Sequence, residues 1–270
     1  MLANAQVTLT KWKAVLAIYF QDNLAYQASW YIWIMTDVVT AVTMPLVWAS
    51  AASSGEIAGF TSSDFVLYYL CMLLVNSFVT SHLMWEIAME IKEGNFSVQL
   101  LRPIGFFSFS FFRNLSMRIT RTVLFTPIFL LLLWAYSGWL QGASVYLGWE
   151  FWVALLLGHM VSFFFVIAMS MIALFTQEAQ SIFELYYVPM LFLSGQLFPI
   201  ALLPNWAQYA SLLFPFYYTT ALPVEILVGR MSGAAALPML GLQVVWVVGL
   251  FFLAKWFWKK GLKHYTGVGM

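Results

Sequence analysis

Long apolar stretches alternate along the chain with shorter segments that hold most of its polar residues. Each stretch has about 19 to 25 residues, and a helix needs ~20 to cross the hydrocarbon core of a bilayer. Within each stretch the apolar residues are continuous rather than alternating, which is typical of membrane helices and not of a transmembrane barrel. The pattern predicts an all-α membrane protein with six transmembrane helices, at 28–50, 65–85, 122–140, 151–175, 183–203 and 235–258.

The composition agrees with this architecture. Of the 270 residues, 63% are hydrophobic, 19% are aromatic and only 9% are charged, whereas soluble domains usually carry about 25% charged residues. No segment between the predicted helices is long enough to form a soluble domain. We therefore exclude a water-soluble globule and expect a single membrane domain over 1–270.

The basic residues gather on one side of the predicted helices. With six spans, eleven of the twelve Lys and Arg residues fall on the face that carries both termini and the segment 86–121, and only Arg230 falls on the other. Because Lys and Arg are enriched on the cytoplasmic side of membrane proteins, both termini and this segment are predicted to be cytoplasmic. The eleven residues are Lys11, Lys13, Lys92, Arg102, Arg113, Arg118, Arg121, Lys255, Lys259, Lys260 and Lys263.

Residues 8–22 form an amphipathic pattern before the first span. Such a helix lies in the headgroup region rather than crossing the membrane. A simple anchor and a functional lever are both compatible with the pattern. The apolar face is formed by Trp12, Val15, Leu16, Tyr19 and Phe20.

Two polar residues stand inside predicted spans. Asp37 lies in the first span, where an acid is costly and must face a partner or a wet cavity. A translocation path, a contact with a second subunit and a hydrogen bond to a neighbouring helix all remain open for it. His159 lies in the fourth span, where a lone histidine is more often a helix–helix hydrogen bond than a functional group.

A proline-rich segment, 199–225, stays apolar although it is too interrupted to form a straight span. Proline removes a backbone donor and ends or kinks helices. We therefore expect short re-entrant helices in the outer leaflet, sheltered by protein. A structural lid and an exit gate are both compatible with this pattern. The candidate lid residues are Pro199, Pro204, Trp206, Pro215 and Tyr217.

Motifs for catalysis and cofactor binding are absent from the sequence. It contains no G-x-x-x-x-G-K-[ST] loop for ATP and no G-x-S-x-G elbow. The three histidines, His82, His159 and His264, are far apart and lack metal-ligand spacing. We therefore expect this chain to catalyse no reaction and to bind no cofactor or metal itself.

The segment 86–121 holds an unusual concentration of charge for this chain. Glu86, Glu90 and Glu93 are spaced to form one acidic stripe on a helix, and "GN" at 94–95 is suited to end that helix in a left-handed cap. Pro103 then stops any further helix nearby. The stripe suits docking into a groove of a soluble protein, and a solvated loop that merely stays out of the bilayer is the alternative.

Three segments carry a family resemblance that covers nearly the whole chain. They are "NLAYQASWYIW" at the start of span one, "IKEGNFSVQLLRPI" between spans two and three, and "LFPIALLPNWAQYASLLFPFYY" after span five. The chain resembles the permease subunits of ABC-2 type exporters, the ABC-2 family transporter proteins, which are six-span membrane components. The second and third segments are moderately specific in combination and weak singly.

The resemblance implies partners and cargo. Two permeases, identical or related, would form the membrane part of an exporter in the bacterial cytoplasmic membrane. Two separate ATP-binding cassette subunits would dock from the cytoplasm and bind the ATP and Mg. Spans rich in Phe, Trp, Tyr and Met favour a hydrophobic or amphipathic cargo, but lipid-facing surfaces share that composition, so the identity of the cargo stays open. Nucleic acid is not expected as a partner.

The resemblance also implies roles for individual residues. The coupling element that fits a cleft on the ATPase would be formed by Glu86, Glu90, Lys92, Glu93 and Gly94, with Arg102 and Pro103 fixing its return toward the membrane. Glu178 and Glu184, in "TQEAQSIFE", would belong to a second cytoplasmic contact. Candidates for the translocation path or the dimer interface are Asp37, His159 and Glu184.

Three other functions compete with this interpretation. An ion-coupled secondary transporter would need a buried acid such as Asp37. A membrane enzyme acting on lipids would need a catalytic cluster, which the sequence lacks. A non-transporting assembly factor with the same fold is the third alternative.

Overall fold

The computed structural model of the chain describes residues 2–25, 27–176 and 179–265, with side chains described for 10–22, 35–36, 38–176 and 179–265. These residues form helices joined by short turns, and the described part contains no β-strand beyond one isolated bridge between Ile57 and Phe60. The prediction of an all-α protein is confirmed for this part of the chain. The helices are α1 (Leu2–Ala25), α2 (Gln27–Ala51), α3 (Ser62–Val79), α4 (Leu83–Lys92), α5 (Phe96–Leu100), α6 (Phe106–Ala135), α7 (Trp149–Ser170), α8 (Ala179–Leu193), α9 (Asn205–Leu213), α10 (Leu222–Leu227) and α11 (Ala236–Gly261).

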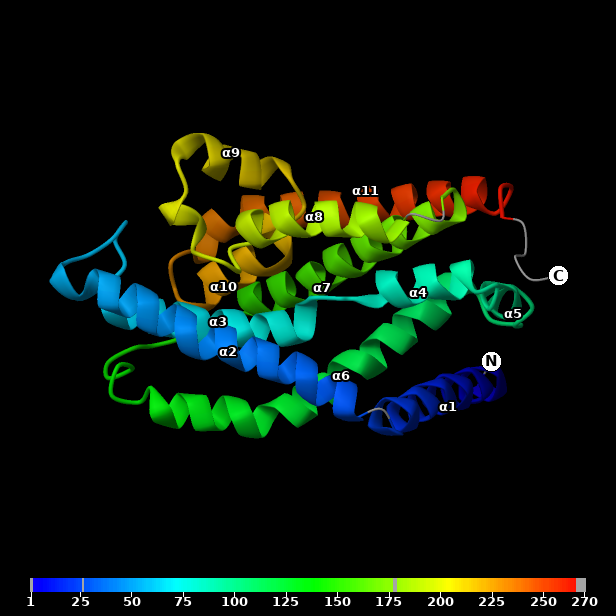
Figure 1. Ribbon diagram of the computed structural model, residues 1–270, viewed down its shortest axis with the longest axis horizontal. Coiled ribbons are helices and arrows are strands. Elements are labelled where there is room, and N and C mark those ends of the chain that lie inside the picture. The colour runs from blue at the N-terminus through cyan, green and yellow to red at the C-terminus, as the bar shows by residue number, and fades with distance from the viewer. Residues whose placement is uncertain (1, 26, 177–178, 266–270) are drawn as a thin grey trace.

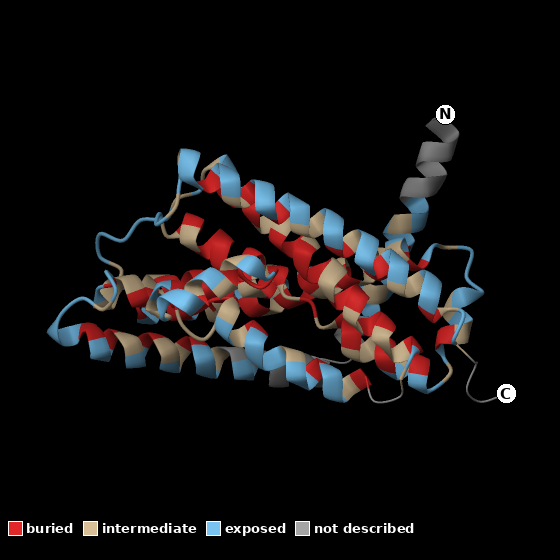
Figure 2. Ribbon diagram, turned by 90° about the horizontal axis from the view of Figure 1, so that it is seen from above, coloured by how far each residue is buried: buried red, intermediate tan, exposed pale blue. Residues whose placement is uncertain are grey.

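The long helices run roughly along one axis and form an elongated bundle (Figure 1). α7 lies at its centre and packs against α11, α3 and α4. Buried residues follow the interior faces of the bundle, whereas the outer sides are largely exposed (Figure 2). Many of the exposed residues are large and hydrophobic, among them Leu130, Leu131, Trp134, Val245 and Phe252. An exposed apolar surface of this extent requires a hydrocarbon environment.

Among the residues that the structure describes, four helical segments are long and apolar enough to cross a membrane, and a fifth is obtained if a bent pair counts as one span. The four are Ser62–Lys92, Phe106–Ala135, Trp149–Leu174 and Gly233–Gly261, and the bent pair is Asn205–Leu213 with Tyr217–Leu227. α2 is helical over 25 residues. The stretch Val38–Ser54, which runs from α2 through the 3-10 turn Ala52–Ser54, counts only as a shorter apolar helix. The count of six spans therefore stays a prediction.

The fifth predicted span, 183–203, is shorter than expected. α8 covers 15 residues and ends at Leu193, and Gly195 then adopts a φ of 76°. The hydroxyls of Tyr68 and Tyr69 on α3 donate to the carbonyls of Gly195 and Leu197, each at 2.8 Å. These bonds to α3 satisfy carbonyls that a longer α8 would have paired within the helix, and the chain changes direction after Leu193.

The third predicted span, 122–140, begins earlier than expected. α6 starts at Phe106 and spans 30 residues, so the second half of the predicted cytoplasmic loop 86–121 is helix. Hydropathy placed the boundary late because Arg113, Arg118 and Arg121 lie in this half. All three are covered in the fold, the last two almost completely.

The segment 199–225 bends sharply. α9 and the helical stretch Tyr217–Leu227, which begins with a π-helical turn (η4, Tyr217–Ala221), are inclined by 83° to one another. The prolines of the segment explain the interruption, since each removes a backbone donor. Whether the pair is one broken span or a re-entrant loop stays a prediction.

α1 extends over Leu2–Ala25, further than the predicted 8–22, and packs along the first half of α6. The rings of Trp12 and Phe112 stack with centroids 4.2 Å apart, and Tyr19 meets Phe109 edge-on at 5.4 Å. The apolar face predicted from Trp12 to Phe20 is therefore occupied in part by another helix. Its placement in the headgroup region stays a prediction.

Candidate functional site

One end of the bundle gathers α4, α5, the beginning of α1 and the end of α11 (right in Figure 1). We call it the α4–α5 end. It contains most residues of the predicted coupling element. The opposite end carries α9, α10 and the turn between α2 and α3.

α4 is held by an apolar face. Leu83, Met84, Ile87, Ala88 and Ile91 are buried and lie in one core cluster with residues of α7 and α8. The helix ends where the N–H of Glu93 donates to the carbonyl of Met89 at 2.9 Å. Gly94 follows with a φ of 80°, the left-handed conformation that suits glycine after a helix.

A second face of α4, next to the buried one, carries two ion pairs. The guanidinium of Arg113, on α6, lies 2.6 Å from Glu86 Oε2 and 2.7 Å from Glu90 Oε1. The side chain of Arg113 is 14% exposed, and those of Glu86 and Glu90 are 38% and 23% exposed. The i, i+4 spacing brings both carboxylates to one side, where a single arginine fork reaches both.

These ion pairs give two acids of the stripe a partner within the chain. Glu86 and Glu90 both contact Arg113 on α6, and the role of the stripe in docking stays a prediction. Glu93 is exposed and accepts a bond from Asn95 Nδ2 at 3.1 Å. Of the three acids, Glu93 alone remains fully at the surface.

Arg113 also connects α4 to α1. Its guanidinium carbon lies 5.6 Å from the ring centroid of Tyr19, within the range of a cation–π contact. Burial raises the pKa of the Tyr19 hydroxyl, an effect opposed by the nearby Arg113 charge. Tyr19 therefore stays neutral at physiological pH. The Arg113 side chain thus contacts residues of both α1 and α4 and joins these helices to α6.

α5 presents an exposed tip beyond α4. Phe96 anchors it, being completely buried against the rings of Phe106, Trp258 and Tyr265. Leu101 is 85% exposed. We call the exposed residues here the α5 tip, which consists of Lys92, Glu93, Val98, Leu100, Leu101, Arg102 and Pro103.

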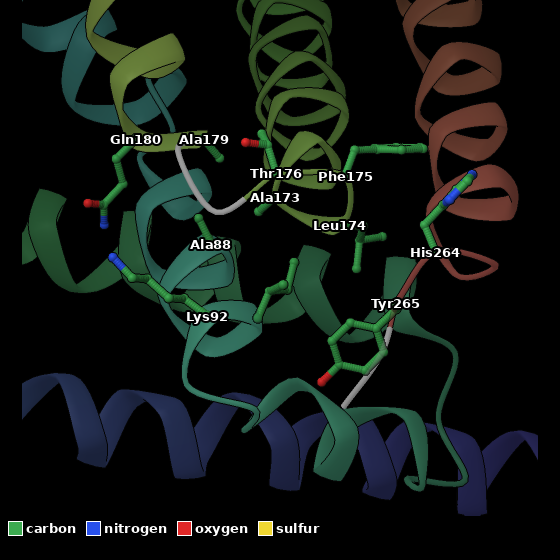
Figure 3. Close-up of a pocket in the computed structure, with 11 residues that line it drawn as sticks. Ala88, Lys92, Ala173, Leu174, Phe175, Thr176, Ala179, Gln180, His264 and Tyr265 are labelled. Carbon is green, nitrogen blue, oxygen red and sulfur yellow. The ribbon is translucent and has the colours of Figure 1, made fainter. Parts of the chain in front are cut away.

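A cavity of about 190 Å³ opens beside the α5 tip (Figure 3). Its walls come from α4, from the turn after α7, from the start of α8 and from the residues after α11. Lys92 borders it on one side and Tyr265 on another, and the Tyr265 hydroxyl lies 2.9 Å from Ser97 Oγ. The lining residues are Ala88, Ile91, Lys92, Ala173, Leu174, Phe175, Thr176, Ala179, Gln180, His264 and Tyr265.

The cavity brings together the two predicted cytoplasmic contacts. Thr176, Ala179 and Gln180 belong to "TQEAQSIFE" and face α4 across it. Glu178 lies outside the described residues. Glu184 is exposed on α8 and is not among the residues that line the cavity.

A break separates α3 from α4 at residues 80–82. The N–H of Ser81 donates to Ser162 Oγ at 3.1 Å, and its hydroxyl donates to Asn114 Oδ1 at 2.8 Å. Arg118 donates to the carbonyl of Thr80. Backbone groups freed by the break thus find partners on α6 and α7, as a break within apolar surroundings requires.

His159 belongs to the same buried polar cluster. Its Nδ1 lies 3.1 Å from the carbonyl of Phe78, and its Nε2 lies 3.4 Å from Asn114 Nδ2. The histidine therefore links three helices by hydrogen bonds, as a lone histidine in a span is expected to do. The side chain of Asp37 lies outside the described residues, so its contacts stay a prediction.

The candidate lid residues differ in exposure. Pro199, Pro215 and Tyr217 are buried, whereas Pro204 and Trp206 are exposed. The Tyr217 hydroxyl donates to Glu225 Oε2 at 2.6 Å. Sequence reasoning passed over Glu225, although a carboxylate in an apolar, proline-rich segment needs such a donor.

Sequence reasoning also missed the roles of Arg113 and Arg118. It assigned them to a loop because they fall between the predicted second and third spans. For Arg113 the signal is the spacing of Glu86 and Glu90, because two acids on one side of a largely buried helix require a cation nearby. For Arg118, which donates to the carbonyl of Thr80, the sequence carries no such signal.

The all-helical bundle with its membrane-length apolar helices defines an integral membrane protein. The chain belongs to the ABC-2 family transporter proteins, whose family model matches residues 35–269. It is thus a membrane permease of an ABC transporter, as the sequence resemblance predicted. No curated protein and no solved structure matches the chain.

Proposed function

We propose that this chain is the translocating subunit of an ATP-driven exporter. A second permease, identical or related, would complete the path, and two ATP-binding subunits would dock at the α4–α5 end. The observation that carries the proposal is the α5 tip, an exposed surface that is both apolar and charged. It is anchored to the bundle by the buried Phe96 and lies beside a cavity of about 190 Å³.

The contacts among α1, α4 and α6 explain how a docked ATP-binding subunit would act on the membrane helices. Arg113 ties α4 to α6 through two ion pairs, and α1 packs along α6 through Trp12 and Tyr19. A push on the α5 tip would therefore move α1, α4 and the first half of α6 together. The lever interpretation of the N-terminal helix is favoured over a simple anchor for the same reason.

The break at 80–82 is the place where such a movement would reach α3. The backbone at 80–82 is not helical, so a change of direction between α3 and α4 would not have to kink a continuous helix. Rotation of α4 about the break would shift α3 against α7. We infer that the buried cluster around Ser81, Asn114 and His159 fixes the resting position of this hinge.

The chemistry of ATP hydrolysis belongs to the partner in this proposal. The sequence contains no P-loop, so ATP and Mg would bind to the ATP-binding subunits and this chain would not be an enzyme. The lysine- and arginine-rich α4–α5 end, with both termini, would face the cytoplasm of a bacterial cell. Cargo would leave under the segment 199–225 at the opposite end.

Copurification tests the proposal. The tagged chain, extracted in mild detergent, is expected to recover a Walker-motif protein in a two-to-two assembly. Leu101→Glu places a charge at the centre of the α5 tip and is expected to reduce that recovery at least tenfold. Ala14→Glu, an apolar-to-acid change at an exposed site on α1, is the matched control and should recover it normally.

Two outcomes would contradict the proposal. One is a chain that purifies alone and transports without ATP, which would direct attention to Asp37 and an ion-coupled mechanism. The other is equal recovery from Leu101→Glu and Ala14→Glu, which would place the motor elsewhere on the surface.

A further inference from the structure

The end of α11 carries the densest cluster of like charge in the chain. Lys255, Lys259, Lys260 and Lys263 fall within nine residues, and all four are exposed. The sequence contains no Asp or Glu after Glu225. Within the described part of the chain, none of the four lysines forms an ion pair, so their charge is not neutralised by the fold.

The lysines lie on the outward side of α11. The residues buried along this helix are Ala236, Leu240, Gln243, Leu250, Ala254 and Gly261. Its exposed apolar residues are Leu237, Leu242, Val244, Val245, Val248, Phe252, Leu253 and Trp256. At about 100° per residue, Lys255 and Lys259 lie about 40° apart inside this exposed side. Lys263, which is exposed as well, follows two residues after the helix ends at Gly261. The lysine stripe therefore continues the apolar stripe that faces lipid.

The depth of the lysines matches the edge of a bilayer. From Ala236 to Lys255 the helix rises about 28 Å at about 1.5 Å per residue, close to the ~30 Å of a hydrocarbon core. Lys259 follows about one turn later, and Lys263 lies just after the end of the helix at Gly261. Their ammonium groups would therefore lie at the level of the lipid phosphates.

Aromatic rings support the lysine side chains. The Lys255 Nζ lies 4.3 Å from the Phe251 ring centroid, and the Lys260 Nζ lies 5.1 Å from that of Trp256. Trp256 is itself 51% exposed. An exposed tryptophan among lysines at this depth is typical of a membrane–water interface.

We propose that Lys255, Lys259, Lys260 and Lys263 bind the headgroups of anionic phospholipids in the leaflet at the α4–α5 end. The occupant is a lipid because the stripe continues a lipid-facing surface rather than the α5 tip. Anionic headgroups supply the negative charge that the fold lacks there, at a gain of about fivefold in affinity for each lysine, which corresponds to about 1 kcal/mol. The inference does not depend on the ATP-binding partner.

Lipid titration of the full chain tests the proposal. The purified chain in mild detergent is titrated with phosphatidylglycerol or with phosphatidylcholine, and bound lipids are counted by native mass spectrometry. We expect selective binding of phosphatidylglycerol. Lys259→Gln with Lys263→Gln should weaken it roughly 25-fold, whereas the matched pair Lys92→Gln with Arg102→Gln, at exposed sites of the α5 tip, should change it less than about threefold.

Two further controls, an arginine variant and a competition with inorganic phosphate, complete the test. Lys259→Arg with Lys263→Arg retains the charge and should bind as the parent does, which separates loss of charge from loss of fold. Inorganic phosphate should displace no more lipid than sodium chloride of equal ionic strength. Equal affinity for the two lipids, equal weakening by both glutamine pairs, or specific displacement by phosphate would each overturn the proposal.

Discussion

Removal of Arg113 tests whether one side chain joins α4 to α6. A charge-assisted hydrogen bond contributes about 1.5–3 kcal/mol, and Glu90, whose side chain is 23% exposed, should contribute about 2 kcal/mol. The Glu86 side chain is 38% exposed, so screening reduces its share to about 1 kcal/mol. We therefore expect Arg113→Gln to lower the free energy of unfolding by about 3 kcal/mol.

A conservative variant separates charge from geometry. Arg113→Lys keeps the charge but lacks the fork that reaches two carboxylates. It should retain the bond to one glutamate and lose about 1.5 kcal/mol. Unfolding by SDS titration in mild-detergent micelles measures both variants against the parent.

A double-mutant cycle provides the control. Arg113→Gln and Glu90→Gln share an ion pair and should show a coupling energy of about 2 kcal/mol. Arg113→Gln and Glu93→Gln share none, because Glu93 bonds to Asn95, and their effects should add within about 0.5 kcal/mol. Additive effects for Arg113 and Glu90 would refute the argument that this pair fixes α4 on α6.

Glycine substitutions and one tyrosine test the packing around the central helix. An added Cβ at Gly158 would lie 2.5 Å from the carbonyl oxygen of Thr219, whereas at Gly241 it meets nothing within 4 Å. Gly158→Ala should therefore destabilise the fold by more than about 2 kcal/mol, and Gly241→Ala should stabilise α11 by about 0.5–1 kcal/mol. The same SDS titration measures both variants. Tyr69→Phe removes the bond to the Leu197 carbonyl and should cost about 1 kcal/mol; an unchanged midpoint would argue against these bonds as the reason that α8 ends at Leu193.

Continuous apolar stretches located most of the helices but not all of their ends. It placed span four at 151–175, where α7 and the turn after it occupy Trp149–Leu174, because that stretch is continuously apolar. It failed at 183–203, where the end of α8 depends on hydroxyls from α3. A partner more than a hundred residues away leaves no mark on the local pattern.

Charge was the weaker guide to the site. The concentration of acids at 86–93 predicts a docking surface, and that stays a prediction, whereas the pairing of Glu86 and Glu90 with Arg113 was not foreseen. A sequence shows that charge is concentrated and does not show whether its counter-ion lies in the same chain. One consequence is practical: Glu90→Lys would disrupt α4 against α6, so Glu93→Lys is the cleaner probe of docking.

The central claim is that an ATP-binding subunit docks on the α5 tip. A photoreactive amino acid at position 101, exposed at the tip, tests it in native membranes against the same residue at position 206, where Trp206 is 75% exposed at the opposite end. The account predicts a cross-link from position 101 to a Walker-motif protein and none from position 206. A cross-link to that protein from position 206 but not from position 101 would contradict it.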